Sequence, residues 1–313
     1  MICGAAMSFH GANDCACQAA RVSGAMPAVA YVNGRYGPIA EAGVSVEDRG
    51  FQFADSLYEV VAVLNGRFLD WEKHLWRLRR GLSALFIEGL PSDAALAHIA
   101  RRLVGLSRYA DGLLYIQVSR GAGRRDHPFP SDTPATLVLT MRRFDFRQRL
   151  PQLETGVPAI SVPDQRWARC DLKTTGLLPA VLAKQEARAV GAFEALFVKD
   201  GTVTEGGSTN IYMVTADGVI VTHPLSARIL PGIARDTLLD LAREAQMKVE
   251  ERPFTIEEAR AAPELFLTST TAPILPIIRL DGGAVGTGRP GPVTARLGQL
   301  AWAEIGRQTG WKP

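Results

Sequence analysis

The sequence predicts an α+β protein built from two domains. Strand and helix patterns are mixed along the 313 residues and include several tight hairpins, instead of alternating strictly as strand–helix–strand units. This mixture argues against a doubly wound nucleotide-binding fold. A polar stretch without clear periodicity precedes residue 157. We therefore expect a small domain over residues 26–145, a linker over 146–156 and a larger domain over 157–313.

Composition narrows the function without identifying it. The chain is 47% hydrophobic and 21% charged, as is typical of globular proteins. Its net charge of +3 and the lack of a long basic run give no reason to expect nucleic-acid or membrane binding. No apolar stretch approaches the roughly 18 residues of a membrane span.

The cysteines and the N-terminal segment indicate where the protein resides. The four cysteines have neither zinc-binding nor redox spacing, so we expect incidental thiols, no metal site and a reducing cytoplasm. Residues 1–25 are rich in Ala, Gly and Ser and lack a basic segment followed by an apolar one, so they do not resemble a signal peptide. We expect a disordered extension, or a true start of translation further along.

The small domain is predicted to contain hairpins, two helices and two further strands. Asn33-Gly34 and Asn65-Gly66 each predict a tight turn between strands, the second one following an apolar strand over 57–64. Four leucines recur at three- and four-residue steps within residues 72–87 and predict an amphipathic helix. Ser92 predicts the cap of a second helix. Strands over 113–119 and 135–141 flank a charged loop over 120–130.

The large domain begins with an apolar run over 157–162, which predicts a buried strand. Further elements follow from periodicity and turn residues. They are a helix over 177–190, a hairpin over 195–205, strands over 210–215, 219–222 and 265–267, a helix that residues 229–235 open and that runs to about 246, and a helix over 292–308.

Lys173 lies between the first strand and the first helix of this domain, among small and apolar residues. A lone lysine is usually a solvated amine whose stem packs on the core. The alternative is a desolvated amine that attacks a carbonyl and holds a Schiff base. A Schiff-base cofactor would also need an anion site, an acid beside a ring nitrogen and a clamp for a substrate carboxylate.

Other segments supply candidates for all three requirements. An anion fits the helix start at 231–234, the hydroxyl-rich run at 268–271 and the side chain of Arg77. Glu205 precedes two glycines that would let a flat ring approach it. Arg125 and His127 are two residues apart in an extended loop, so they share one side of it. Each candidate alone has an ordinary explanation as a turn, a helix start or a solvated loop.

In combination, these segments resemble a known family. Arg169-Cys-Asp-Leu-Lys173, Val203-Thr-Glu-Gly206, Ile229-Leu-Pro-Gly-Ile233 and Leu267-Thr-Ser-Thr-Thr271 follow one another in the order seen in fold-type IV pyridoxal-phosphate enzymes. The resemblance extends from about residue 31 to the C-terminus. Within that group, Glu47-Asp-Arg-Gly-Phe-Gln-Phe53, Tyr58-Glu-Val-Val61 and Arg125-Asp-His127 are most similar to the D-amino-acid (D-alanine) aminotransferases.

The resemblance implies a small α/β domain, a larger pseudo-barrel domain and a homodimer in which loops of one subunit reach the partner's site. It implies that Lys173 binds pyridoxal 5′-phosphate as a Schiff base and that Glu205 faces the pyridine nitrogen. Residues implied at or near the phosphate are Arg77, Ile233, Ala234 and Thr270, with Ser208 and Ser269 as nearby polar groups. Residues implied to bind the substrate carboxylate are Tyr58, Arg125 and His127.

The function implied is ping-pong transamination between a D-amino acid and a 2-oxo acid such as 2-oxoglutarate. Two alternatives stay open, a branched-chain L-amino-acid aminotransferase and an eliminase of the aminodeoxychorismate lyase type. A non-enzymatic relic is disfavoured, because binding alone would not need both Lys173 and Glu205. Ala62 stands where a longer polar residue is expected, which leaves the substrate side-chain pocket and the acceptance of (R)-amines open.

Overall fold

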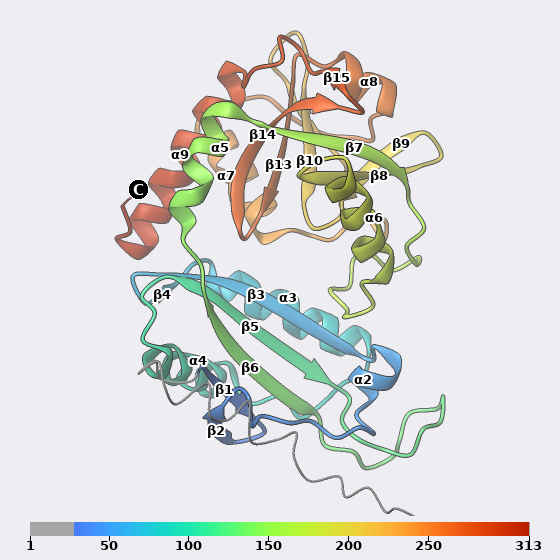
Figure 1. Ribbon diagram of the computed structural model, residues 1–313, viewed down its shortest axis with the longest axis vertical. Coiled ribbons are helices and arrows are strands. Elements are labelled where there is room, and N and C mark those ends of the chain that lie inside the picture. Colours follow the sequence, from blue (N-terminus) through green and yellow to red (C-terminus); the bar gives the residue numbers. More distant parts are fainter. Residues whose placement is uncertain (1–27, 313) are drawn as a thin grey trace, which may run out of the picture.

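The computed structural model describes residues 28–312 and consists of two lobes, each built on one β-sheet (Figure 1). The small lobe contains the six-stranded sheet, in the order β2-β1-β6-β5-β3-β4, and the large lobe contains the nine-stranded sheet. The expectation for residues 1–25 lies outside the described residues. Mixed helices and sheets confirm the predicted α+β class.

The small sheet is antiparallel throughout its described pairs. Its hairpin turns are formed as predicted, because Asn33 and Gly34, like Asn65 and Gly66, all have positive φ, the conformation of the tight turn that suits strand twist. Its strands are β1 (Val29–Val32), β2 (Arg35–Pro38), β3 (Ser56–Leu64), β4 (Arg67–Phe68), β5 (Gly112–Ser119) and β6 (Thr136–Arg143).

Two helices pack on this sheet, α3 (Trp71–Ala84) against β3, and α4 (Asp93–Ser107) against β1 and β6. The predicted leucine stripe is buried in α3, where Leu75, Leu78 and Leu82 join the core of the lobe. Ser92 caps α4 by accepting a hydrogen bond from the Ala95 amide. A five-residue helix that the sequence did not predict, α2 (Arg49–Phe53), precedes β3.

The segment expected to link the domains is mostly helical. It contains the 3₁₀ turn η1 (Phe146–Arg149) and α5 (Leu150–Thr155). Phe146 is fully buried in an apolar cluster that also contains Leu64 of β3, and Trp302 and Trp311 from the C-terminal end of the chain. The two lobes therefore share an apolar seam, because one cluster draws side chains from both of them.

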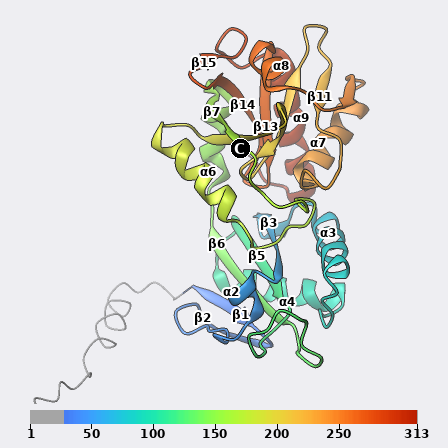
Figure 2. The same ribbon diagram turned by 90° about the vertical axis from the view of Figure 1, so that its right-hand side faces the viewer.

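The large sheet has the order β12-β11-β10-β13-β14-β7-β8-β9, with β15 beside β14, and it curls into a half-barrel (Figure 2). Strand β7 (Val157–Pro163) pairs in parallel with both neighbours, and the segment that follows it runs down toward the small lobe (Figure 1). The other strands are β8 (Glu194–Lys199), β9 (Thr202–Gly206), β10 (Asn210–Val214), β11 (Ile220–Thr222), β12 (Val249–Glu251), β13 (Glu264–Ser269), β14 (Ala272–Leu280) and β15 (Gly283–Ala284).

Helices of the large lobe are α6 (Leu178–Ala189), α7 (Ile233–Glu244), α8 (Ile256–Ala261) and α9 (Pro292–Thr309). Helices α7 and α9 cover one face of the sheet, where Leu238 and Leu297 pack with the stacked rings of Tyr212 and Phe266. Within the described residues, no helix has the length and apolarity needed to cross a bilayer.

Candidate active site

A cavity of about 790 Å³ lies between the lobes, and both lobes line it. All but one of the residues predicted for the site line this cavity, although they come from distant parts of the chain. They are Tyr58, Arg77, His127, Lys173, Glu205, Ser208, Ile233, Ala234, Ser269 and Thr270. Arg125 is the exception, and it lies exposed on the 120–130 loop nearby.

Lys173 is positioned by a strand of the opposite lobe. Strand β4 covers only the last residues of β3, Val63 and Leu64. The first residues of the same edge pair with the Lys173 segment: Tyr58 N donates to Lys173 O at 3.0 Å, and Thr175 N donates to Ser56 O at 3.3 Å. The Lys173 amine lies 4.3 Å from the centroid of the Tyr58 ring. Backbone pairing therefore fixes the lysine in the cavity, with its amine against an aromatic face.

Glu205 is a buried carboxyl with three donors. Its Oε1 accepts from Arg166 Nη1, and its Oε2 accepts from Leu230 N at 2.9 Å and from Asn210 Nδ2 at 3.2 Å. Burial raises the pKa of Glu205 to about 7, although Arg166 and the Leu230 amide oppose the rise. A carboxyl with this pKa can exchange a proton with a ring nitrogen near neutral pH.

Asp164 holds Arg166 in place and was not predicted. It accepts from Arg166 Nε at 2.9 Å and from Nη2 at 2.8 Å, and it also accepts from the Thr204 hydroxyl. Burial would raise the pKa of Asp164, but Arg166 outweighs it and the pKa is lowered. Arg166 thus bridges the carboxylates of Asp164 and Glu205. The Glu205 carboxyl is fixed by Arg166 at one oxygen and by Leu230 N and Asn210 Nδ2 at the other.

The glycines after Glu205 line the cavity and also pack closely against neighbouring protein atoms. A Cβ on Gly206 would lie 2.1 Å from Thr209 Oγ1, and a Cβ on Gly207 would lie 3.0 Å from Lys184 Cδ. Their missing side chains therefore leave room for neighbouring protein atoms, and this packing is what the structure requires of them.

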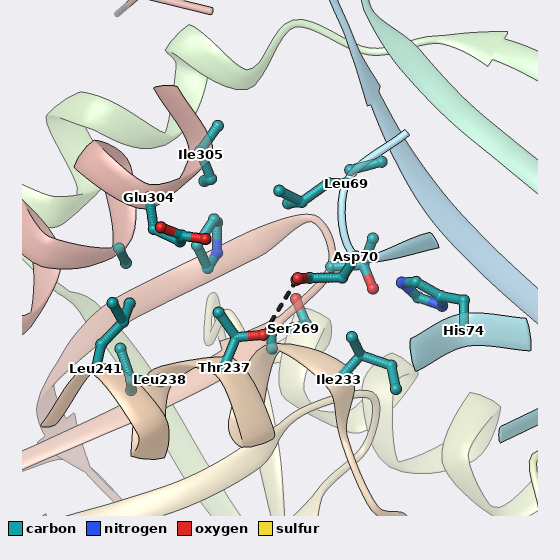
Figure 3. Close-up of a pocket in the computed structure, with 15 residues that line it drawn as sticks. Leu69, Asp70, His74, Ile233, Thr237, Leu238, Leu241, Ser269, Glu304 and Ile305 are labelled. Carbon is teal, nitrogen blue, oxygen red and sulfur yellow. Dashed lines mark hydrogen bonds between the residues drawn. The ribbon is translucent and has the colours of Figure 1, made fainter. Parts of the chain in front are cut away.

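The anion site predicted at residues 231–234 is the start of α7. Gly232 is the N-cap and no side chain caps the helix, so the amides of Ile233 and Ala234 have no acceptor within it. Ser269 and Thr270 lie beside this helix start, and Figure 3 shows Ile233 and Ser269 around a small adjoining cavity of about 40 Å³. Free amides and hydroxyls at one end of the large cavity suit a phosphate.

Arg77 is buried behind this anion site and is bound mainly by Glu59. Its Nε and Nη2 donate to the Glu59 carboxylate at 2.8 and 2.7 Å, and its Nη1 donates to Pro231 O at 2.8 Å. His74 Nδ1 lies 2.7 Å from the same carboxylate. Burial would raise the pKa of Glu59, but Arg77 and His74 lower it to about 2. Arg77 therefore supports the helix start and keeps two N–H groups for an anion.

Glu59 and His74 were missed as site residues. A signal was present, because Glu59 shares the α3-facing side of β3 with Leu57 and Val61, where an unpaired charge would be costly. Ala62, which the sequence linked to the substrate side-chain pocket, does not line the large cavity. Its side chain lines the small cavity and the apolar seam, so it does not shape the large cavity.

The residues predicted to bind a substrate carboxylate lie at the rim of the cavity. Arg125 and His127 are exposed, and both lie near the Phe53 ring, Arg125 Cζ at 5.1 Å and the His127 ring at 5.8 Å between centroids. Tyr58 stacks on Tyr115, with 5.5 Å between ring centroids. The buried Arg49 donates hydrogen bonds to backbone carbonyls of the 120–130 loop. The sequence did not predict this role of Arg49.

An amine, a buried carboxyl and an anion-binding helix start around one cavity are the parts of a pyridoxal-phosphate site. The family model for class IV aminotransferases matches residues 56–280, and the chain belongs to this family. It is therefore an aminotransferase that depends on pyridoxal 5′-phosphate. The donors present fit that cofactor, because the α7 amides, Ser269 and Thr270 suit its phosphate and Lys173 suits its aldehyde.

Known proteins of the family resemble the chain over most of its length. It is 40% identical to a D-alanine aminotransferase of Bacillus licheniformis over 85% of this chain and 93% of that protein. It is 37% identical to a D-alanine aminotransferase of Listeria monocytogenes over 86% of this chain and 93% of that protein. A branched-chain amino acid aminotransferase of Escherichia coli superposes with a TM-score of 0.82 at 25% identity, covering 91% of this chain and 96% of that one.

Proposed function

We propose that this aminotransferase takes its amino group from a D-amino acid similar to D-alanine and passes it to a 2-oxo acid such as 2-oxoglutarate. The observation that carries the proposal is the Arg125/His127 loop at the rim of the cavity that contains Lys173. The D-alanine aminotransferases among its relatives support the same substrate class.

In this proposal, Lys173 binds the cofactor and moves a proton at the substrate Cα, since its amine lies inside the cavity. The bound cofactor supplies an electron sink for the carbon that loses this proton. Glu205 holds the proton at the ring nitrogen, for which a pKa of about 7 is suited. Arg166 and Asp164 keep its carboxyl oriented.

The remaining residues orient the two charged ends of the reactants. The phosphate would be held by the amides of Ile233 and Ala234, with Thr270, Ser269, Ser208 and Arg77 around it. The substrate carboxylate would be bound by Tyr58, Arg125 and His127, because a guanidinium and an imidazole together favour an anion. This division leaves the substrate α-carbon between the carboxylate clamp and the lysine.

We propose further that the protein is a cytoplasmic homodimer in which loops of one subunit reach the site of its partner. The exposure of Arg125 at the rim of the cavity supports a partner surface there. A reducing compartment agrees with the free, buried thiol of Cys170.

The function is tested by absorbance of the purified, cofactor-loaded protein before and after separate additions of D-alanine and L-leucine. We expect D-alanine alone to remove the long-wavelength band of the lysine-bound cofactor, because a transaminase half-reaction converts the cofactor to its amine form. Conversion by L-leucine alone would assign the branched-chain activity instead. A band indifferent to both amino acids would favour an eliminase.

The carboxylate clamp gives a prediction of its own. Arg125→Ala should raise KM for D-alanine by about 10- to 100-fold, which corresponds to one lost hydrogen bond to a charged group. Cofactor content should not change, because Arg125 lies outside the anion end of the cavity. Arg124→Ala is the matched control, since Arg124 is an exposed neighbour on the same loop. Loss of the cofactor from the Arg125 variant would contradict the assignment.

A further inference from the structure

Arg49 is a buried arginine whose hydrogen bonds hold the carboxylate loop by its backbone. Only 4% of the residue is exposed. Its Nη1 donates to Asp126 O at 2.6 Å and more weakly to Pro128 O at 3.4 Å, and its Nη2 donates to His127 O at 3.2 Å. One guanidinium thus gathers the carbonyls of three consecutive residues, immediately beside Arg125.

Asp55 fixes the direction of Arg49. Its Oδ2 accepts from Arg49 Nε at 2.8 Å and from Arg120 Nε at 2.7 Å. Burial would raise the pKa of Asp55, but the two guanidinium groups lower it below its usual value. The carboxylate is therefore ionised at neutral pH and orients both arginines.

Arg120 anchors the beginning of the same loop. Its guanidinium donates to Leu85 O at 2.7 Å and to Phe86 O at 3.0 Å, beyond the end of α3. Its Cζ lies 3.6 Å from the centroid of the Phe129 ring, near the end of the loop. Two arginines bound to one aspartate therefore hold the loop at its start, middle and end.

The Arg49 hydrogen bonds act on the backbone of the loop, and the side chains of Arg125 and His127 stay exposed. Arg125 and His127 can therefore keep one spacing without any hydrogen bond between them. A lysine could not reproduce the Arg49 contacts, because an ammonium is a point charge and lacks the planar fork that meets several carbonyls.

We propose that Arg49, oriented by Asp55, is a positioning residue that sets the affinity of the enzyme for the substrate carboxylate by fixing the shape of residues 125–128. This inference rests on the proposed carboxylate clamp. Arg49 acts through the loop, so its removal should weaken carboxylate binding and spare both the cofactor and the chemical step.

The test compares Arg49→Lys, Arg125→Ala and the double variant, with Arg124→Lys as the control. Arg49→Lys should raise KM for D-alanine by about 10- to 100-fold, because displacing the carboxylate-binding side chains by about 1 Å weakens their contacts with the substrate by a factor of this order. The rate of the half-reaction at saturating D-alanine and the cofactor content should stay within about twofold of the wild type, since both depend on other contacts. Inhibition by propanoate, which has the carboxylate but no amine, should weaken by the same factor.

The double variant separates positioning from direct binding. If Arg49 works through Arg125, adding Arg49→Lys to Arg125→Ala should raise KM little further, because residues that share one function are not additive. Additive effects would overturn the proposal, as would an unchanged KM in Arg49→Lys. If Arg125→Ala itself leaves KM unchanged, the carboxylate clamp fails, whatever Arg49 does.

Asp55→Asn keeps the test decisive if Arg49→Lys does not fold. This variant leaves the arginines in place but removes the charge that orients them. The proposal expects the same rise in KM and the same weakening of propanoate. A lowered melting temperature with unchanged KM would show a merely structural role and overturn it.

Discussion

Replacing Lys173 by alanine is expected to abolish transamination and to leave the fold intact. The amine is the group in the cavity that can bind an aldehyde and move the proton at the substrate Cα, so the half-reaction with D-alanine should slow by about 10⁴-fold or more. Stability should change little, because the loop is held through backbone atoms of residues 173 and 175, which alanine retains. Stopped-flow absorbance measures the first effect and thermal unfolding the second.

Lys248→Ala is the matched control, because Lys248 is exposed and lines none of the described cavities. Its half-reaction should match the wild type. The same variant tests the assignment of Lys173 directly. If Lys173→Ala still shows the lysine-bound absorbance after loading with cofactor, another amine binds the cofactor and the assignment of Lys173 is wrong.

The second large effect is expected from Glu59→Gln. Glu59 is 1% exposed, pairs with Arg77 and shares a hydrogen bond with His74, so its replacement leaves a buried arginine without its counter-ion. The lowering of its pKa from 4.5 to about 2 corresponds to about 3 kcal/mol of stability at pH 7. The cofactor should also dissociate faster, because Arg77 holds the Pro231 carbonyl next to the anion site. Urea unfolding and cofactor release measure the two effects.

The contribution of Glu59 has a defined pH dependence. Its pKa is lower in the folded state, so the folded protein binds fewer protons here than the unfolded chain, and stability falls as pH falls. The stabilisation is complete above about pH 4.5 and is lost as pH approaches about 2. The free energies of unfolding of wild type and Glu59→Gln should therefore converge over this window. Glu186→Gln, on the exposed side of α6, should follow the wild type, and a constant gap would exclude Glu59 as the cause.

Local sequence patterns predicted most of the fold because they report local physics. The Asn-Gly turns, the leucine stripe of α3 and the Ser92 cap depend on neighbours a few residues away, and all three are formed. Strand β14 was missed, since Pro273 and Pro276 interrupt its pattern. It is nevertheless a central strand, paired with β13 on one side and with β7 on the other.

The candidate site was predicted unevenly for a related reason. Lys173, Glu205 and the α7 start stand in short motifs, and the structure brings them to one cavity. Arg49, Asp55 and Glu59 are charged residues whose roles depend on burial and on partners 6 to 79 residues away. Their roles come from packing between distant segments, and one sequence alone does not reveal such packing.

The pairing of the Lys173 segment with β3 has a consequence for how such an enzyme can change. In the proposed assignment, the phosphate-binding turn at residues 231–234 and Glu205 belong to the large lobe, whereas Tyr58 and the 120–130 loop belong to the small lobe. The hydrogen bonds that join them at the lysine use the main chain of residues 56 and 58, which side-chain replacements other than proline leave in place. Substrate preference can therefore diverge through the small lobe while the reactive amine keeps its register. In this assignment, the small lobe contacts the substrate carboxylate, and most of the groups that act on the cofactor belong to the large lobe.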